Sequence, residues 1–339
     1  MSTNDLGAAG QTGAALQYVA DQRDISAPAA DRRRITDPAI AAELLRDELL
    51  DRLNAVFRDH PGDPVILLSG GVDSIAVAAA ARQLGHRPRA ITVVTDDSST
   101  DATNSAQAAA ALDLEHDLLV LDGQAVTDLA HDAVSRLGTP ELWEVSYAVP
   151  LLAVARALDQ RTGVGAILTG SAADAILAGG KTLDNPIDSA AATAEVDRII
   201  RKESGGNFRY QRLIPDFYAR VLPQYESRFV LVFQTLRFWE LAEQFAPPAL
   251  FGEHDGIPAD KLCLRLLCEQ LLPAGTGHLA WTKKDAIQRS AGIMGALATA
   301  ARRYAAQLPG AQTYTDPMTE PMDAVATRLF LANLARESE

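Results

Sequence analysis

The fold is decided by one stretch, Val65-Ile66-Leu67-Leu68-Ser69-Gly70-Gly71-Val72-Asp73-Ser74, and by the apolar run at 75–84 that follows it. The four apolar residues predict a strand buried on both faces, and the run predicts a helix. Glycines between strand and helix let backbone N–H groups close around phosphate oxygens, which the helix dipole also favours. Ser69 and Ser74 add hydroxyl donors, and Asp73 could hold Mg²⁺ between phosphates. A plain strand-to-helix turn is the alternative, but the position at the end of a buried strand favours a phosphate site.

Short apolar runs alternate with helical patterns around this turn. Strands are expected at 65–68, 90–94, 117–121 and 166–168, and helices at 37–58, 75–84, 102–112, 126–137 and 147–158. This alternation predicts an α/β fold with a doubly wound parallel sheet. Beyond residue 180 we expect a polar loop at 181–206, with a Ser-Gly-Gly turn at 204–206. An almost wholly helical region then follows, with helices at 236–245, 260–272, 293–307 and 322–336.

Composition narrows the class of protein. The 339 residues include 31 basic and 44 acidic ones, for a net charge of −13, which argues against a nucleic-acid partner because phosphate contacts need clustered Lys and Arg. Apolar residues make up 47% of the chain, enough for a core, and no run of about 18 of them predicts a membrane span. We see no signal peptide, and two cysteines cannot form a disulfide framework. These features lead us to expect a cytoplasmic globular protein.

A second motif runs from residue 167 to 180 and reads Ile-Leu-Thr-Gly-Ser-Ala-Ala-Asp-Ala-Ile-Leu-Ala-Gly-Gly. Its Asp174 follows another predicted strand, so it could share one Mg²⁺–pyrophosphate group with Asp73, although a helix N-cap is the alternative role. The two motifs together resemble the asparagine synthetase and β-lactam synthetase family, which are N-type ATP pyrophosphatases with a PP-loop. The resemblance covers residues 40–295 of the synthetase domain and implies a sheet of the ATP pyrophosphatase type, with ATP and Mg²⁺ as ligands.

The resemblance implies a nucleotide site made of residues far apart in sequence. Its ATP- and pyrophosphate-binding members would be Ser69, Gly70, Gly71, Val72, Asp73, Ser74, Val94, Gly170 and Lys284. Lys284 stands eight residues before Gly292, a spacing at which the family has a Lys that stabilises the departing phosphate. Lys283 is the fallback, and a solvated helix flank is the ordinary interpretation of either lysine.

Catalytic and substrate-binding roles are implied for further residues. Lys261 either holds phosphate or substrate or belongs to a solvated helix face. Glu226 falls roughly where the family has a Glu that helps to activate the nucleophile, and a structural role is equally open. The implied substrate-binding residues are Glu144, Ser146 and Ser171. Ser171 stands where asparagine synthetase has Glu and β-lactam synthetase has Tyr, and a serine is a poor base, so the nucleophile stays open.

The resemblance implies a synthetase that adenylates a small-molecule carboxylate, releases pyrophosphate and passes the acyl group to ammonia or an amine, in specialised biosynthesis such as that of antibiotics. Ala175 replaces a Glu of asparagine synthetase, which argues against asparagine as the product. The chain begins Met1-Ser2 rather than with the Cys of the family's glutaminase domain, so we expect free ammonia, an amine or a separate glutaminase partner to supply nitrogen. The alternatives are ATP-dependent sulfur insertion, which would need an accessible cysteine, and a non-catalytic degenerate synthetase.

This interpretation divides the chain into four parts. A partly ordered lead-in is expected at 1–36 and an ATP-binding α/β domain at 37–180. A helical cap at 181–308 would complete the synthetase domain, and a tail with one helix would occupy 309–339.

Overall fold

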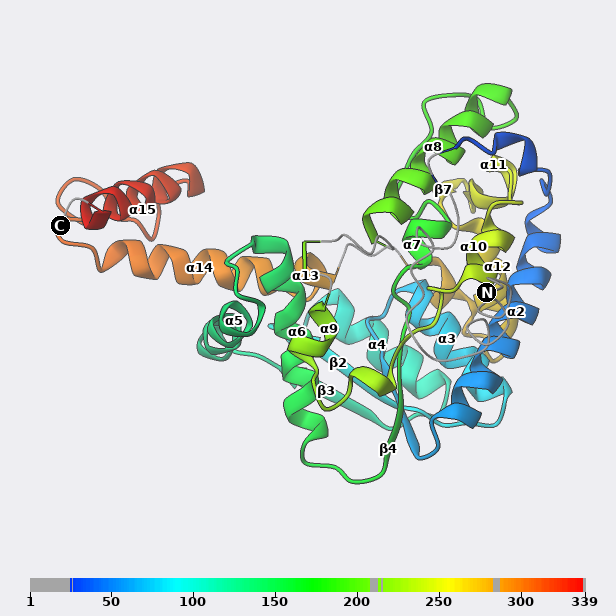
Figure 1. Ribbon diagram of the computed structural model, residues 1–339, viewed down its shortest axis with the longest axis horizontal. Helices are drawn as coiled ribbons and strands as arrows, with labels where there is room; N and C mark the ends of the chain where they lie inside the picture. The colour runs from blue at the N-terminus through cyan, green and yellow to red at the C-terminus, as the bar shows by residue number, and fades with distance from the viewer. Residues whose placement is uncertain (1–24, 26, 208–212, 215, 283–286, 338–339) are drawn as a thin grey trace, which may run out of the picture.

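A five-stranded parallel sheet forms the centre of the molecule (Figure 1). The computed structural model describes residues 25, 27–207, 213–214, 216–282 and 287–337. The strands are β1 (Asp63–Leu67), β2 (Arg89–Val94), β3 (His116–Val120), β4 (Val164–Thr169) and β5 (Phe229–Leu231), in the order β3-β2-β1-β4-β5. All four pairings are parallel, which confirms the predicted α/β sheet.

Helices cover both faces of this sheet because successive strand side chains point to opposite faces. Ile66 and Leu168 lie in the core beneath α2 (Pro38–Asp59), α3 (Val72–Gln83) and α4 (Thr100–Ala111). Val65 and Ile167, one residue earlier on each strand, lie in the core beneath α5 (Gly123–Leu137) and α6 (Leu142–Leu158). The inner strands β2 and β4 are buried on both faces, as predicted, whereas the edge strand β3 leaves Leu118 and Val120 partly exposed.

Two predictions beyond residue 180 are wrong. The polar stretch contains α8 (Ala190–Asn207), which continues through the predicted Ser-Gly-Gly turn. Ala192, Val196 and Ile200 are fully buried at a four-residue spacing, so an apolar stripe holds the helix on the core. The pattern also did not indicate β5, which pairs with β4 through Thr169 and Leu231, because three residues are too few for a periodic signal.

The remaining elements complete the helical layers and the rim. The short helices are η1 (Ala30–Arg32), α7 (Ala173–Ile176), α9 (Phe217–Val221), η2 (Glu226–Arg228), α10 (Leu236–Ala242), α11 (Pro247–Leu250), η3 (Gly277–Trp281) and α13 (Ile287–Ser290). The hairpin of β6 (Gly252–His254) and β7 (Ile257–Ala259) precedes α12 (Leu262–Leu271).

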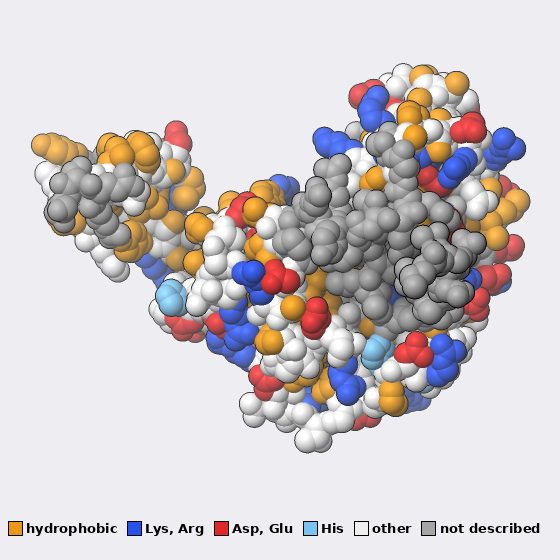
Figure 2. All heavy atoms as spheres, in the orientation of Figure 1, with side chains coloured by type: hydrophobic (Ala, Val, Ile, Leu, Met, Phe, Trp, Pro, Cys, Tyr) orange, Lys and Arg blue, Asp and Glu red, His pale blue; other side chains and the backbone are white. Residues whose placement is uncertain are grey.

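The last two helices, α14 (Ile293–Ala306) and α15 (Met322–Glu337), form an arm that projects from the body, and hydrophobic side chains gather on it (Figures 1 and 2). Within the described ranges, no helix is long and apolar enough to cross a bilayer.

Candidate active site

The predicted phosphate loop lies between β1 and α3, with Gly71 as the N-cap of the helix. The Ser74 hydroxyl donates to the Gly71 carbonyl at 3.0 Å and accepts from the Ser69 N–H at 3.2 Å. Gly70 has a φ of +74°, and a Cβ there would stand 2.9 Å from the Cβ of Asn104. The loop is therefore held by its own serine and requires glycine at its tightest point.

The second motif comes close to this loop because β1 and β4 are neighbours in the sheet. A Cβ on Gly170 would lie 2.6 Å from the carbonyl carbon of Asp73 and from the Ser74 nitrogen. A Cβ on Gly179 would lie 1.9 Å from Asp174 Oδ1. Both glycines let backbone pass beside the acidic residues, which explains why glycine stands at these places in the motif.

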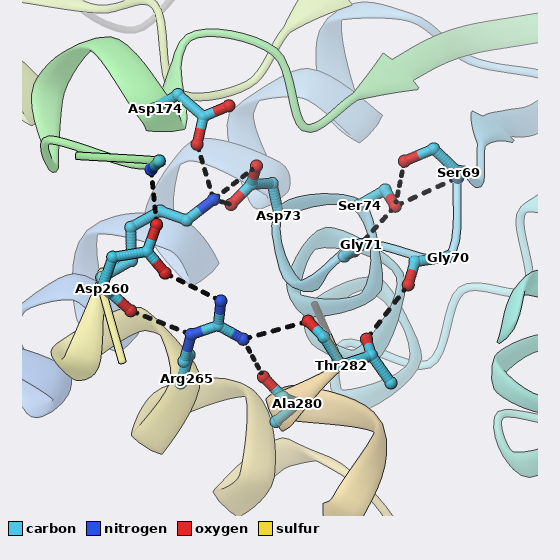
Figure 3. Close-up of polar contacts among 12 residues, drawn as sticks. Ser69, Gly70, Gly71, Asp73, Ser74, Asp174, Asp260, Arg265, Ala280 and Thr282 are labelled. Atoms are coloured by element: carbon cyan, nitrogen blue, oxygen red, sulfur yellow. Dashed lines mark hydrogen bonds and ion pairs between the residues drawn. The ribbon is translucent and has the colours of Figure 1, made fainter. Parts of the chain in front are cut away.

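Lys261 joins the two acidic residues (Figure 3). Its Nζ lies 2.7 Å from Asp73 Oδ1 and 2.6 Å from Asp174 Oδ1. Lys261 is 6% exposed and has a φ of +49°, so the solvated-face interpretation is wrong for this lysine. The strained backbone and the buried ammonium indicate a residue whose position matters to a site.

The electrostatics of this cluster shift both partners. Burial raises the pKa of Asp73 to about 6, although the ammonium of Lys261 acts in the opposite direction. Burial lowers the pKa of Lys261, but the carboxylates of Asp73 and Asp174 outweigh it and hold that pKa above its ordinary value. Lys261 is therefore charged near neutral pH, while Asp73 gains or loses its proton at a pH only slightly below neutral.

The side chain of Arg265 supports the cluster, although from the sequence its spacing of four from Lys261 is equally typical of a solvated helix face. Arg265 is 8% exposed and donates to the Asp260 side chain at 2.8 Å and to the Ala280 carbonyl at 2.9 Å. Asp260 in turn accepts from the Gly180 N–H, and the Thr282 hydroxyl donates to the Gly70 carbonyl at 3.3 Å. The arginine thus ties α12 and η3 to both glycine motifs. Its four-residue spacing from Lys261 was the available signal.

The carboxylates of Asp73 and Asp174 fit a Mg²⁺ ion. The two carboxylates follow neighbouring strands and lie close together, since the ammonium of Lys261 contacts both of them. Mg²⁺ is commonly held by one or two carboxylates, with water and substrate phosphates as its other ligands. Among the described residues no group of three or more His, Cys, Asp or Glu gathers as a metal site, so these two would need phosphate oxygens to complete a shell.

A cleft of about 1940 Å³ opens above this cluster. Its lining includes the phosphate loop, Asp73, Asp174 and Lys261, and it also reaches Glu144 and Ser171. The structure therefore brings together the core of the predicted site, from the carboxyl ends of β1 and β4.

Matching against family models pairs residues 62–245, more than half of the 339, with the family described as asparagine synthase. The chain belongs to the asparagine synthase family. Membership confirms the resemblance and supports an ATP-dependent, amide-forming synthetase as the general function. The matched residues of this asparagine synthase domain include Asp73, Gly170 and Asp174 and end before Lys261.

Two solved structures resemble parts of the chain. NMN synthetase from Francisella tularensis is 20% identical with a TM-score of 0.30, over 48% of this chain and 74% of its own length. NAD+ synthetase from Burkholderia pseudomallei is 16% identical with a TM-score of 0.27, over 66% of this chain and 98% of its own length. At these TM-scores the likeness carries no further argument. A comparison with curated protein sequences finds no match.

Three of the residues predicted for the asparagine synthase site lie in the described part of the chain but do not join the site. Ser146 is fully buried and bonds to the Trp143 carbonyl, because it lies two residues from Glu144 and hence on another side of α6. Glu226 precedes β5 and so lies at the amino edge of the sheet, away from the cleft. Val94 is fully buried, with its carbonyl bonded to the Leu121 N–H. Lys284 and its fallback Lys283 lie outside the described residues.

Proposed function

We propose that this member of the asparagine synthase family adenylates a small-molecule carboxylate with ATP and then forms an amide, releasing AMP and pyrophosphate. The observation that carries the proposal is the convergence of Asp73, Asp174 and Lys261 beside a phosphate loop. Two carboxylates for Mg²⁺ and one buried cation suit a triphosphate that must lose pyrophosphate.

In the proposed first step, a carboxylate oxygen of the substrate attacks the α-phosphorus of ATP. The bond from that phosphorus to the α–β bridging oxygen breaks, and pyrophosphate leaves with the electron pair. Mg²⁺, held by Asp73 and Asp174, would neutralise phosphate charge. Lys261 supplies a positive charge from a buried position, which strengthens its interaction with the departing group because less water screens it.

In the proposed second step, the nitrogen of ammonia or an amine attacks the acyl carbon, AMP leaves, and the nitrogen gives up a proton. Ser171 lines the cleft but cannot act as a base near neutrality. The role of the protein is therefore to hold the two reactants in line and exclude water. We keep Lys284 in the proposal as the second cation and leave Glu226 and Ser146 out of it.

Substrate-dependent pyrophosphate release tests the proposal, with a panel of carboxylic acids and with ammonia or hydroxylamine as the acceptor. Asp73→Asn and Lys284→Ala are expected to abolish release while circular dichroism stays unchanged. The matched control is Asp47→Asn, since the Asp47 side chain is 69% exposed on α2, and it is expected to behave as wild type. Wild-type release from both site variants would refute the assignment.

Sulfur insertion, the alternative function, finds no support in the described cysteines. Cys263 and Cys268 are fully buried, and burial raises the pKa of the Cys263 thiol to about 12. A sulfur carrier must be exposed and ionise readily. A Cys263→Ser, Cys268→Ser variant that forms amide at the wild-type rate would exclude that role.

A further inference from the structure

The wall of the cleft beside the phosphate loop is aromatic. Trp143, Tyr147, Pro150 and Leu151 of α6 all line the cleft. They stand at positions i, i+4, i+7 and i+8, so they form a single stripe along one side of the helix. The wall is therefore a continuous surface of α6 and not a chance meeting of loops.

Trp143 is exposed although it lies within a hollow. The residue is 47% exposed, and the guanidinium carbon of Arg289 lies 5.5 Å from the centre of its ring. Leu213, on the same cleft lining, is 64% exposed. Large apolar groups that line a cleft and face solvent are typical of a surface that a ligand covers.

The floor beneath this stripe is aromatic as well. Tyr147 stacks on Phe217 with ring centres 5.5 Å apart, and Tyr218 stacks on Phe229 at 5.1 Å. The hydroxyls of Tyr147 and Tyr218 lie 3.3 Å apart, so the two rings present a pair of polar tips at the edge of an apolar surface.

This aromatic end adjoins the reacting end. Leu67, Thr169 and Leu231 end β1, β4 and β5, three neighbouring strands, and all three residues line the cleft. Ser69 follows Leu67 by two residues, and Gly170 follows Thr169 directly. A group that lies on the aromatic wall can therefore extend its carboxylate along the strand ends toward the phosphate loop.

Among the described residues, the side chains of α6 and α13 on the cleft that carry charge near neutrality are Glu144 and Arg289. A substrate with an α-ammonium and two carboxylates would have to leave water for a surface that is mainly aromatic, and that costs free energy unless each charge is paired. A flat apolar acid loses little water there.

We infer that the carboxylate substrate is an aromatic acid, with its ring packed on the Trp143–Tyr147 stripe and its carboxylate directed to the phosphate loop. Such an acid carries a single carboxylate on a ring or a short arylalkenyl chain, as in 4-hydroxybenzoate and 4-hydroxycinnamate. A ring hydroxyl would bond to the paired Tyr147 and Tyr218 hydroxyls. The inference rests on the proposed function for the step that follows, but the binding itself does not depend on it.

Two measurements separate the inference from the function. Equilibrium dialysis of 4-hydroxycinnamate, with a non-hydrolysable ATP analogue present, is expected to detect binding that Trp143→Ala weakens about tenfold or more and Trp143→Phe largely restores. Tyr314→Ala is the matched control, because Tyr314 is 94% exposed and outside the cleft, and it is expected to bind as wild type.

The second measurement is pyrophosphate release with 4-hydroxybenzoate, 4-hydroxycinnamate, cyclohexanecarboxylate and aspartate. Release with the aromatic acids above the other two supports the inference. Release with aspartate or cyclohexanecarboxylate but not with the aromatic acids overturns the inference and leaves the function standing. Binding that depends on Trp143 without release from any acid supports the pocket and refutes the function. Wild-type binding by Trp143→Ala overturns the inference whatever the release.

Discussion

Replacing Lys261 with methionine tests the charge cluster most directly. The variant keeps the volume of the side chain and removes the ammonium, which leaves the carboxylates of Asp73 and Asp174 without a cation. Removing one partner of a buried ion pair costs about 3–5 kcal/mol. The Asp73 side chain is 21% exposed, so its ion pair with Lys261 is largely buried and this cost applies to it. The Asp174 side chain is 65% exposed, so water screens its ion pair with Lys261 and the loss of that pair costs little. We expect the free energy of unfolding to fall by about 2–3 kcal/mol.

The loss should depend on pH in a defined direction. In the wild type the pKa of Asp73 is raised to about 6, above its value of about 4 in an unfolded chain. The folded state therefore binds this proton more tightly, and stability falls as pH rises from about 4 to about 6. Without the ammonium the pKa of Asp73 rises further, because that ammonium no longer stabilises its charged form. The loss of unfolding free energy in Lys261→Met is therefore expected to be small near pH 5, where Asp73 is mostly protonated in both proteins, and to reach its full value near pH 8.

Urea unfolding followed by tryptophan fluorescence, in EDTA and in millimolar Mg²⁺, measures both effects. Because the two carboxylates fit Mg²⁺, the ion should recover part of the stability of the variant. Lys181→Met is the control, since Lys181 and Glu203 form an ion pair with side chains 38% and 31% exposed, and it should cost at most about 1 kcal/mol. An equal loss at both pH values, with no effect of Mg²⁺, would refute the reasoning.

Four further outcomes are expected. Gly170→Ala places a Cβ 2.6 Å from the Asp73 backbone, so it should cost about 1–3 kcal/mol and abolish ATP binding in equilibrium dialysis. Ser74→Ala loses the bond to the Gly71 carbonyl, so it should raise the KM for ATP, and an unchanged KM would contradict the loop geometry. Arg265→Met should lower stability by about 3 kcal/mol in urea titrations, and Arg265→Lys should not restore it, because an ammonium cannot span these acceptors. Pyrophosphate release should rise with pH through about 6 as Asp73 ionises, and a flat profile would argue against ionised Asp73 as a metal ligand.

The sheet and the phosphate loop were predictable because their signals are local. A buried strand, a glycine turn and a helix follow one another within the stretch at 65–84, and the glycines of both motifs stand where backbone must pass close to Asp73 or Asp174. Four of the five strands were expected for the same reason. Local periodicity of apolar residues is enough to predict a strand or helix that one continuous segment forms.

The parts that were not predictable depend on contacts across long distances in the chain. In the sequence, Arg265 is indistinguishable from a solvated surface charge. Only the packing of α12 against η3 brings the carbonyls of Ala280 and Thr282 within hydrogen-bond distance of it. Glu226 was placed by a loose correspondence to a family segment, and only the direction of β5 shows that it lies at the opposite edge of the sheet. Ser146 was grouped with Glu144, but a spacing of two residues places their side chains on different sides of α6, and Ser146 packs inward.

The late position of β5 in the chain has a consequence during synthesis. The outer edge of β4 gains its partner only when residues 229–231 have been made, 60 residues after β4 ends at Thr169. At about 5–20 residues per second, that edge waits roughly 3–12 s for its partner. An open, apolar strand edge is a template for pairing with another chain. A nascent chain on the ribosome therefore carries an unpaired strand edge that the folded protein lacks, and a fragment that stops before β5 would keep that edge open permanently.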